Sequence, residues 1–195
     1  MSTAAGEPLR KLSIALVHYP VIDAKKALVT TTVTNLDVHD LARSARTFGC
    51  EAYFVVHPVP AQLALVERIR EHWTTGSSAA RIPTRKEALK LLRPVPDLAS
   101  VYAAFGGRSE VDVWATAARA SREPLAFADA RATLATPGKP VVILFGTGWG
   151  LPTTLLDEVD ALLPPLCARE GRGDGYNHLS VRAACAMALD RLVGQ

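Results

Sequence analysis

Cysteine is scarce in this chain of 195 residues, and the three that occur, Cys50, Cys167 and Cys185, include no Cys-x-x-Cys pair. A disulfide framework or a structural zinc site is therefore disfavoured, and we expect reduced thiols and no metal centre. Long hydrophobic runs are absent too: no run of about 18 apolar residues could span a bilayer, and residues 1–11 lack the apolar core of a signal peptide. These absences together favour a cytoplasmic protein.

A strong excess of charge of either sign is also missing. The chain has 22 Lys and Arg against 19 Asp and Glu, which gives a formal net charge of +3. That balance permits a polyanionic partner without requiring one, because nucleic-acid binding depends on local clusters of Lys and Arg. With 49% hydrophobic residues and no internal repeat, the composition predicts one domain over residues 12–195 behind a flexible tail at 1–11.

Apolar runs alternate with segments of helical spacing along the chain. The runs predict buried strands at 12–19, 52–57, 111–115 and 139–145. Helix signals predict helices at 35–48, 61–73, 87–92, 97–105, 127–134, 153–163 and 181–192. We expect the β-favouring run at 29–33 to extend toward the next helix rather than to join the sheet. The alternation indicates an α/β fold of three layers, with a mostly parallel sheet covered on both faces.

The predicted helix at 35–48 carries a polar stripe beside its apolar core face. Thr34-Asn-Leu-Asp37 resembles a capping box with Asp in place of Glu. On one flank His39, Arg43 and Arg46 line up at i, i+4 and i+7, with Asn35 beside them. Two interpretations stay open: the stripe is an ordinary solvated helix flank, or it faces the phosphates of a substrate.

A glycine-rich loop follows the most apolar predicted strand. Gly146, Gly148 and Gly150 occupy alternate positions, so a ligand could lie close against the backbone there. The loop is neither the G-x-G-x-x-G dinucleotide fingerprint nor a P-loop, because no glycine spacing of the first kind and no Gly-Lys-Ser/Thr is present. The loop is either a structural turn or a site for a nucleotide-like molecule.

A second polar turn, Asn177 to Ser180, leads directly into the apolar helix at 181–192. Its side chains can cap that helix, where free backbone N–H groups gather partial positive charge. Ser180 lacks the G-x-S-x-G elbow, which disfavours a serine hydrolase. The simplest interpretation is a capped core helix. The polar turn and the glycine loop lie close together in the sequence, however, and this favours one shared pocket.

Four phrases together resemble the SPOUT superfamily of S-adenosylmethionine-dependent RNA methyltransferases, and within it a small single-domain bacterial family. They are Val-His-Tyr-Pro-Val at 17–21, Thr-Asn-Leu-Asp-x-His-Asp-x-Ala-Arg-Ser-Ala-Arg-Thr at 34–47, Phe-Gly-Thr-Gly-Trp-Gly-Leu at 145–151 and Tyr-Asn-His-Leu-Ser-Val-Arg at 176–182. The last two are the specific ones, and the resemblance spans residues 12–194. It implies a C-terminal trefoil α/β knot, S-adenosyl-L-methionine as cofactor, a tRNA or rRNA substrate, and a homodimer formed through the first and last helices.

The resemblance also implies roles for individual residues. It assigns catalysis to Arg43, Asn177 and Ser180, and substrate binding to Asn35, His39, Arg43, Arg46 and Arg182. His39 and His178 are further candidates for a general base. It assigns cofactor binding to Ala115, Thr116, Ala117, Phe145, Gly146, Thr147, Gly148, Trp149, Gly150, Leu151, Leu163, Asn177, His178, Leu179 and Ser180.

Two other functions remain open from the sequence. One is a non-catalytic knot protein that binds S-adenosylmethionine or RNA. The other is an unrelated nucleotide-dependent enzyme, such as an oxidoreductase, that uses the loop from Gly146 to Gly150. Because a separate RNA-binding domain is not evident, target recognition is expected from the surface of the core or from a partner.

Overall fold

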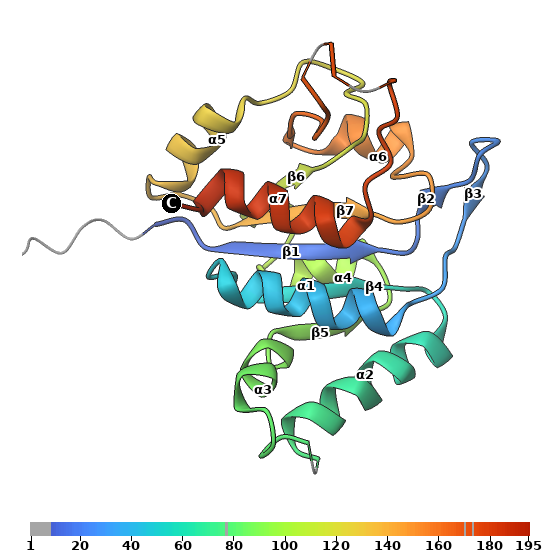
Figure 1. Cartoon of the computed structure of the whole chain (residues 1–195), viewed down its shortest axis with the longest axis vertical. Helices are drawn as coiled ribbons and strands as arrows, with labels where there is room; N and C mark the ends of the chain where they lie inside the picture. The colour runs from blue at the N-terminus through green and yellow to red at the C-terminus, as the bar shows by residue number, and fades with distance from the viewer. Residues whose placement is uncertain (1–8, 77, 170, 173) are drawn as a thin grey trace, which may run out of the picture.

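A computed structural model describes residues 9–76, 78–169, 171–172 and 174–195 of the chain. Its centre is a parallel sheet of six strands in the order β5-β4-β1-β7-β6-β8 (Figure 1). The strands are β1 (Leu12–Val17), β4 (Ala52–Val56), β5 (Leu92–Val95), β6 (Asp112–Ala115), β7 (Val141–Gly146) and β8 (Ala161–Leu162). The predicted mostly parallel α/β architecture is therefore confirmed.

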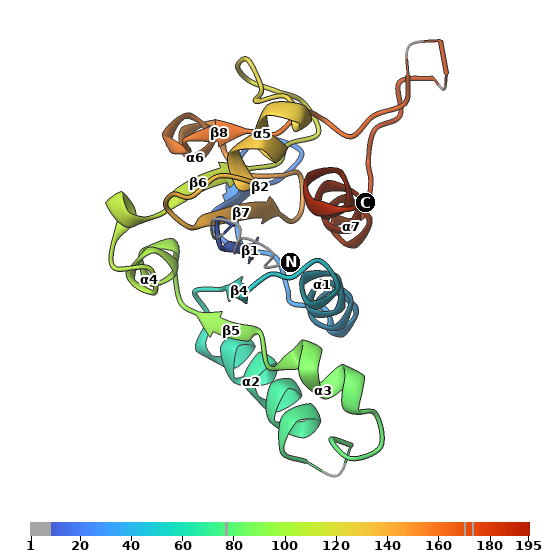
Figure 2. The same ribbon diagram turned by 90° about the vertical axis from the view of Figure 1, so that its left-hand side faces the viewer.

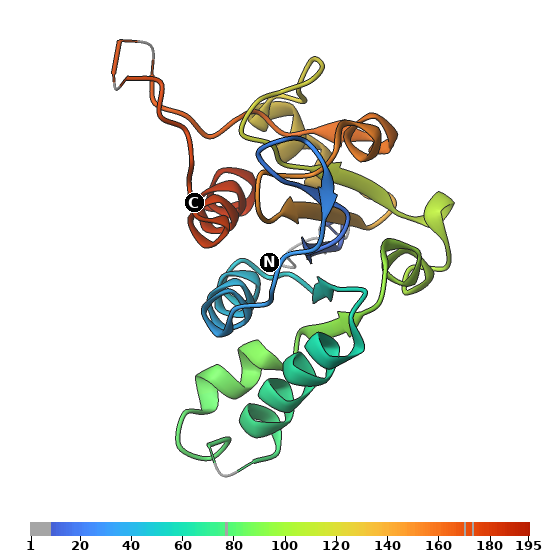
Figure 3. The ribbon, with the colours of Figure 1, turned by 90° about the vertical axis from the view of Figure 1, so that its right-hand side faces the viewer.

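Helices cover both faces of this sheet (Figures 2 and 3). One layer contains α1 (Asn35–Thr47), α2 (Pro60–Thr74), α3 (Pro83–Leu89), α5 (Phe127–Leu134) and α7 (Val181–Val193). The other contains α4 (Leu98–Ala103) and α6 (Thr153–Glu158), with the short 3-10 helix η1 at Arg108–Glu110. Alternate residues of β1 enter the two cores, since Ile14 and Leu16 pack into one and Ala15 and Val17 into the other. A strand buried on both faces explains its unbroken apolar run.

Two predicted helices were wrong in part. The helix expected at 87–92 ends earlier, and Leu92 begins strand β5 at the edge of the sheet. Pro94 is tolerated there because an edge strand leaves one side of its backbone without a ladder partner. The helix expected at 153–163 ends at Glu158. Asp160 then bonds to both backbone groups of Val113, and strand β8 begins at Ala161.

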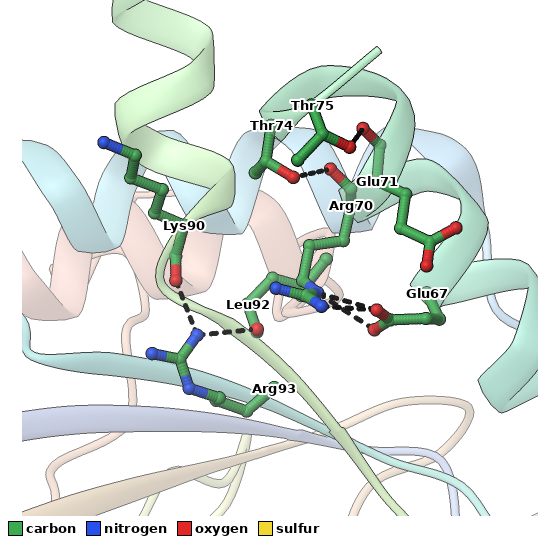
Figure 4. A network of polar contacts seen from close by, with 8 residues as sticks. All are labelled: Glu67, Arg70, Glu71, Thr74, Thr75, Lys90, Leu92 and Arg93. Atoms are coloured by element: carbon green, nitrogen blue, oxygen red, sulfur yellow. Dashed lines mark hydrogen bonds and ion pairs between the residues drawn. The ribbon is translucent and has the colours of Figure 1, made fainter. Parts of the chain in front are cut away.

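Polar contacts fix the corner where α2, α3 and β5 meet (Figure 4). Arg70 of α2 pairs with Glu67 one turn earlier, and Arg93 of β5 donates to the backbone oxygens of Lys90 and Leu92. Both guanidinium groups are thereby committed to internal contacts of this corner.

A small hairpin follows β1 and stands apart from the main sheet (Figure 1). Its strands β2 (Val21–Ile22) and β3 (Leu28–Val29) pair antiparallel, so the run at 29–33 leads to α1 without joining the six strands, as expected. Of the predicted tail, residues 1–8 lie outside the described ranges, whereas Arg10 and Lys11 form ion pairs with Asp112 and Glu51. None of the helices in the described ranges is long and apolar enough to cross a membrane.

Candidate functional site

A cavity of about 480 Å³ opens at the carboxyl ends of β6 and β7. This volume lies within the range of small-molecule sites in proteins. On one side of β1 the sheet continues with β4 and β5, and on the other side with β7, β6 and β8. The strand order therefore reverses between β1 and β7, and the cavity adjoins this point. Open parallel sheets bind their ligands at such a point.

The glycine loop forms one wall of this cavity, and its backbone is locked in place. Gly148 and Gly150 have φ angles of +60° and +104°, which other residues adopt only at a cost. At Gly146 a Cβ would lie 2.8 Å from the backbone nitrogen of Leu151. The loop is bonded to the hairpin, since Trp149 N–H donates to Ile22 O and Ile22 N–H donates to Gly150 O, each at 3.0 Å.

A buried chain of hydrogen bonds connects this loop to the centre of the sheet. Thr147 Oγ1 donates to Val17 O at 3.0 Å, so it accepts from Thr31 Oγ1. The bond to Thr147 uses the single hydrogen of the Thr31 hydroxyl, so this oxygen can only accept from His18. His18 Nδ1, which lies 2.9 Å away, is therefore the donor of that contact. The buried Nε2 of His18 has no hydrogen-bond partner among the described residues, so a second ring hydrogen would be unsatisfied there and the ring is neutral.

Burial first, and then the charge of the neighbouring His57, lowers the pKa of His18 to about 4. The second imidazole lies 5.4 Å away, ring centre to ring centre. His57 accepts from Val59 N–H at Nδ1 and contacts Thr31 O through Nε2, so it is neutral as well. Both histidine rings contact Thr31, and the Thr31 hydroxyl bonds to Thr147 of the glycine loop.

The turn before α7 forms the opposite wall. Ser180 is the N-cap of α7, and its hydroxyl accepts from Ala183 N–H at 3.2 Å. Asn177 donates from its side-chain amide to Ala118 O at 2.9 Å, which ties this turn to the loop after β6. The His178 ring lies edge-on to Trp149 of the glycine loop, with 5.7 Å between the ring centres. Three separate loops thus meet around one cavity.

Most residues predicted to bind the cofactor lie on the wall of this cavity. They are Thr116, Ala117, Phe145, Gly146, Thr147, Gly148, Trp149, Gly150, Asn177, His178, Leu179 and Ser180. Ala115, Leu151 and Leu163 are buried in the core and are not part of the lining. The prediction missed residues of the hairpin exit, of α1, of α5 and of the apolar walls: Thr31, Thr32, Thr34, Asp37, Ala118, Phe127, Pro164, Leu166, Val181, Ala184 and Ala188.

The residues predicted to bind substrate lie outside the cavity, on and beside α1. His39 packs edge-on to Trp73 of α2 at 5.4 Å, and burial followed by the charge of Arg85 lowers its pKa. Arg43 is exposed, as are Asn35 and Arg46.

An ion-pair chain connects the cavity wall to this exposed stripe. Arg182 of α7 contacts Asp37, which lines the cavity, at 2.8 Å. The same guanidinium lies 3.5 Å from Asp40, and Asp40 lies 3.8 Å from Arg43. The alternating charges fasten α1 to α7 and run from the cavity to the surface. The sequence did not reveal the pairing, because its partners are about 140 residues apart.

Fold and cavity together define an α/β protein that binds a nucleotide-like ligand on backbone loops at the carboxyl ends of parallel strands. A family model described as SAM-dependent RNA methyltransferase matches residues 11–194. The chain belongs to this family.

Individual relatives agree with the family match. The chain is 38% identical to a tRNA (guanine-N(1)-)-methyltransferase of Oleidesulfovibrio alaskensis and 40% identical to one of Nitratidesulfovibrio vulgaris, over 98% and 97% of its own length. It spans only 44% and 43% of these relatives. Among solved structures, a TrmH/SpoU tRNA modifying enzyme of A. aeolicus matches with a TM-score of 0.57 and 14% identity, over 96% of this chain and 76% of that one. This last likeness shows the shared fold.

Proposed function

We propose that this protein transfers a methyl group from S-adenosylmethionine to a nucleotide of RNA. The observation that carries the proposal is the convergence of three loops on one cavity, in a chain whose family match covers residues 11–194. The relatives named for tRNA are more than twice as long as this chain. We therefore propose only the class of substrate, a tRNA as in the relatives' names or an rRNA, and leave the nucleotide open.

The cavity fits S-adenosylmethionine in its size and in the groups that it presents. Its glycines have no side chains, so a ligand can lie close to the loop backbone, and Leu166, Leu179 and Val181 supply apolar wall for an adenine ring. The cofactor supplies an electrophilic methyl group, and the protein's part is to hold donor and acceptor in line.

Arg43 and Arg46 are the groups we expect to contact RNA phosphate. Both are exposed on α1, whose N-terminal turn contributes Thr34 and Asp37 to the cavity. Arg46 lies nine positions after Asp37 along the helix, a rise of about 13 Å, so one RNA strand can reach the cavity and both cations. The guanidinium fork stays charged and binds phosphate in a fixed geometry. The stripe on α1 is thus a phosphate-facing surface in this proposal.

Asn177 has a positioning role here, because its amide holds the turn before α7 against Ala118. An acceptor that carries a proton must lose it during transfer, and His178 is the imidazole that lies on the cavity wall. His39 faces Trp73 instead and contacts no cavity residue in the described ranges.

We propose further that two copies associate through α1 and α7 and that the C-terminal segment forms the trefoil knot of the superfamily. Leu36 on α1 and Met187 and Val193 on α7 expose 63%, 40% and 40% of their surfaces, although all three are apolar. Exposed apolar side chains on neighbouring helices favour a protein contact.

Mass spectrometry of RNA nucleosides tests the proposed function in cells. Digested RNA from cells that contain the protein is compared with RNA from cells that lack it, and with cells complemented by the Arg43→Ala variant. One methylated nucleoside should disappear with the protein and return only with the wild-type chain. Unchanged nucleosides, together with measurable binding of S-adenosylhomocysteine, would instead indicate a non-catalytic binding module.

A further inference from the structure

Three aromatic side chains gather at the mouth of the cavity, and two of them expose most of their surface. Trp149 is 63% exposed and Tyr176 is 77% exposed. The His178 ring lies between them, 5.7 Å from Trp149 and 5.3 Å from Tyr176, measured between ring centres. Exposed aromatic surface of this size beside a ligand cavity marks an interaction site.

The backbone presents these rings in a fixed position. Trp149 follows Gly148 in a turn closed by the bond from Gly150 N–H to Thr147 O at 3.0 Å. That turn is bonded to the hairpin through Trp149 N–H and Gly150 O. Tyr176 N–H donates to the Asp174 carboxylate, and the next residue, Asn177, is tied to Ala118. These bonds limit the backbone entropy that is lost when a partner covers the rings.

We infer that Trp149, His178 and Tyr176 form a stacking platform that holds an unstacked base of the RNA substrate at the cavity mouth. The inference rests on the proposed function and adds that an unstacked base is the part of the RNA that these residues bind. Trp149 and His178 line the cavity itself, so a base on the platform lies next to the methyl donor's space. Single-stranded bases bind aromatic faces in many RNA-binding proteins, because every base has a π face. A base inside a duplex must leave its stack before an enzyme can act on it.

Direct binding of single-stranded RNA tests the platform without relying on turnover. The probe is a short RNA that carries 2-aminopurine at its centre, and its matched control is the same RNA with an abasic site there. S-adenosylhomocysteine is present throughout. Wild-type protein should quench the 2-aminopurine fluorescence and bind the complete RNA more tightly than the abasic one. Trp149→Ala and Tyr176→Ala should each weaken binding of the complete RNA about 5- to 100-fold and leave binding of the abasic RNA within a factor of two.

Two further variants separate stacking from other effects. Trp149→Phe keeps a ring and should restore most of the affinity, while Leu65→Ala removes an exposed apolar group on α2 and should change nothing. Equal losses for the complete and the abasic RNA would overturn the inference. A change in the protein's solution mass without a change in base binding would also overturn it, because the rings would then be a subunit contact. Base-dependent binding without any methyl transfer would keep the platform and refute the proposed function.

Discussion

His18 shows how a single buried side chain supports the site. It has no exposed surface, and the one hydrogen bond of its ring within the described residues goes to Thr31, which bonds to Thr147 on the glycine loop. Taking up a proton would place a charge and an unbonded Nε2–H in the core beside His57. The neutral ring is thus a requirement of the native structure.

Stability should consequently fall as the solution becomes acidic. The pKa of His18 is about 4 in the folded chain against 6.5 in the unfolded chain, so the unfolded state binds more protons between these values. The free energy of unfolding then decreases as pH falls from about 6.5 toward 4, by roughly 3 kcal/mol from this residue. Urea unfolding at several pH values measures the slope, which should flatten in His18→Gln. An unchanged slope in that variant would show that His18 does not carry the effect.

Ser180 is the residue for which structure and sequence suggest different roles. The sequence resemblance implies catalysis, whereas the structure shows its hydroxyl capping α7. Ser180→Ala should lower the free energy of unfolding by about 1 kcal/mol, because an N–H of the first turn loses its partner. Ser180→Thr keeps a capping hydroxyl and should recover most of this loss. If Ser180→Ala unfolds at the wild-type urea concentration, the cap contributes nothing to stability.

The cavity-wall residues of the glycine loop and of the turn before α7 were predictable because glycines and polar residues there stand next to recognisable elements. Residues such as Phe127 and Ala188 were not, because nothing in their local pattern distinguishes a cavity wall from ordinary core. Asp37 was identified only as a capping residue, and its place on the cavity wall depends on the packing of α7 against α1. Such positions are fixed by tertiary contacts rather than by spacing in the sequence.

At the scale of elements, the contact between hairpin and glycine loop determines the cavity's shape. A Cβ at Gly148 would lie 3.2 Å from both Ile22 O and Thr31 Cγ2, whereas a Cβ at Gly150 meets no atom within 4 Å. Both positions have positive φ and would strain an alanine by about 1–2 kcal/mol.

Gly148→Ala should therefore destabilise the protein more than Gly150→Ala does. The additional loss is about 1 kcal/mol, since the hairpin must move away from the loop. Chemical unfolding of the two variants gives this comparison, and calorimetry with S-adenosylhomocysteine shows whether the moved hairpin also weakens cofactor binding. Equal stabilities would mean that the hairpin yields freely and does not shape the cavity.

Strands with long apolar runs were predicted correctly, whereas the two edge strands β5 and β8 were missed. Arg93 and Pro94 in β5 and the short span of β8 do not resemble buried strands. Edge positions permit such residues, because one side of the backbone carries no ladder partner. The alternation of strands and helices predicted a parallel sheet, but it did not predict the two edge strands.

For the whole molecule, the proposed dimer places the exposed apolar residues of α1 and α7 between two subunits. Met187→Glu buries a charge in that contact and should shift the protein from dimer to monomer. Leu65→Glu is the matched control and should leave the dimer intact. Leu65 is 42% exposed and lies on α2, which packs on α3 and on the edge strand β5. Light scattering after size-exclusion chromatography measures both. A wild-type protein that is monomeric at high concentration would refute the arrangement.

Methyl transfer itself tests the central claim most directly. Purified protein is mixed with isotopically labelled S-adenosylmethionine and total bacterial RNA, and label in the RNA is counted. Wild type should label RNA, Arg43→Ala and Asn177→Ala should lose most of the activity, and Leu65→Ala should retain it. Calorimetry measures S-adenosylhomocysteine binding by each variant, and a loss of activity in a variant that still binds is assigned to substrate handling or chemistry. Failure to label any RNA, by a folded protein that binds the cofactor tightly, would contradict the account.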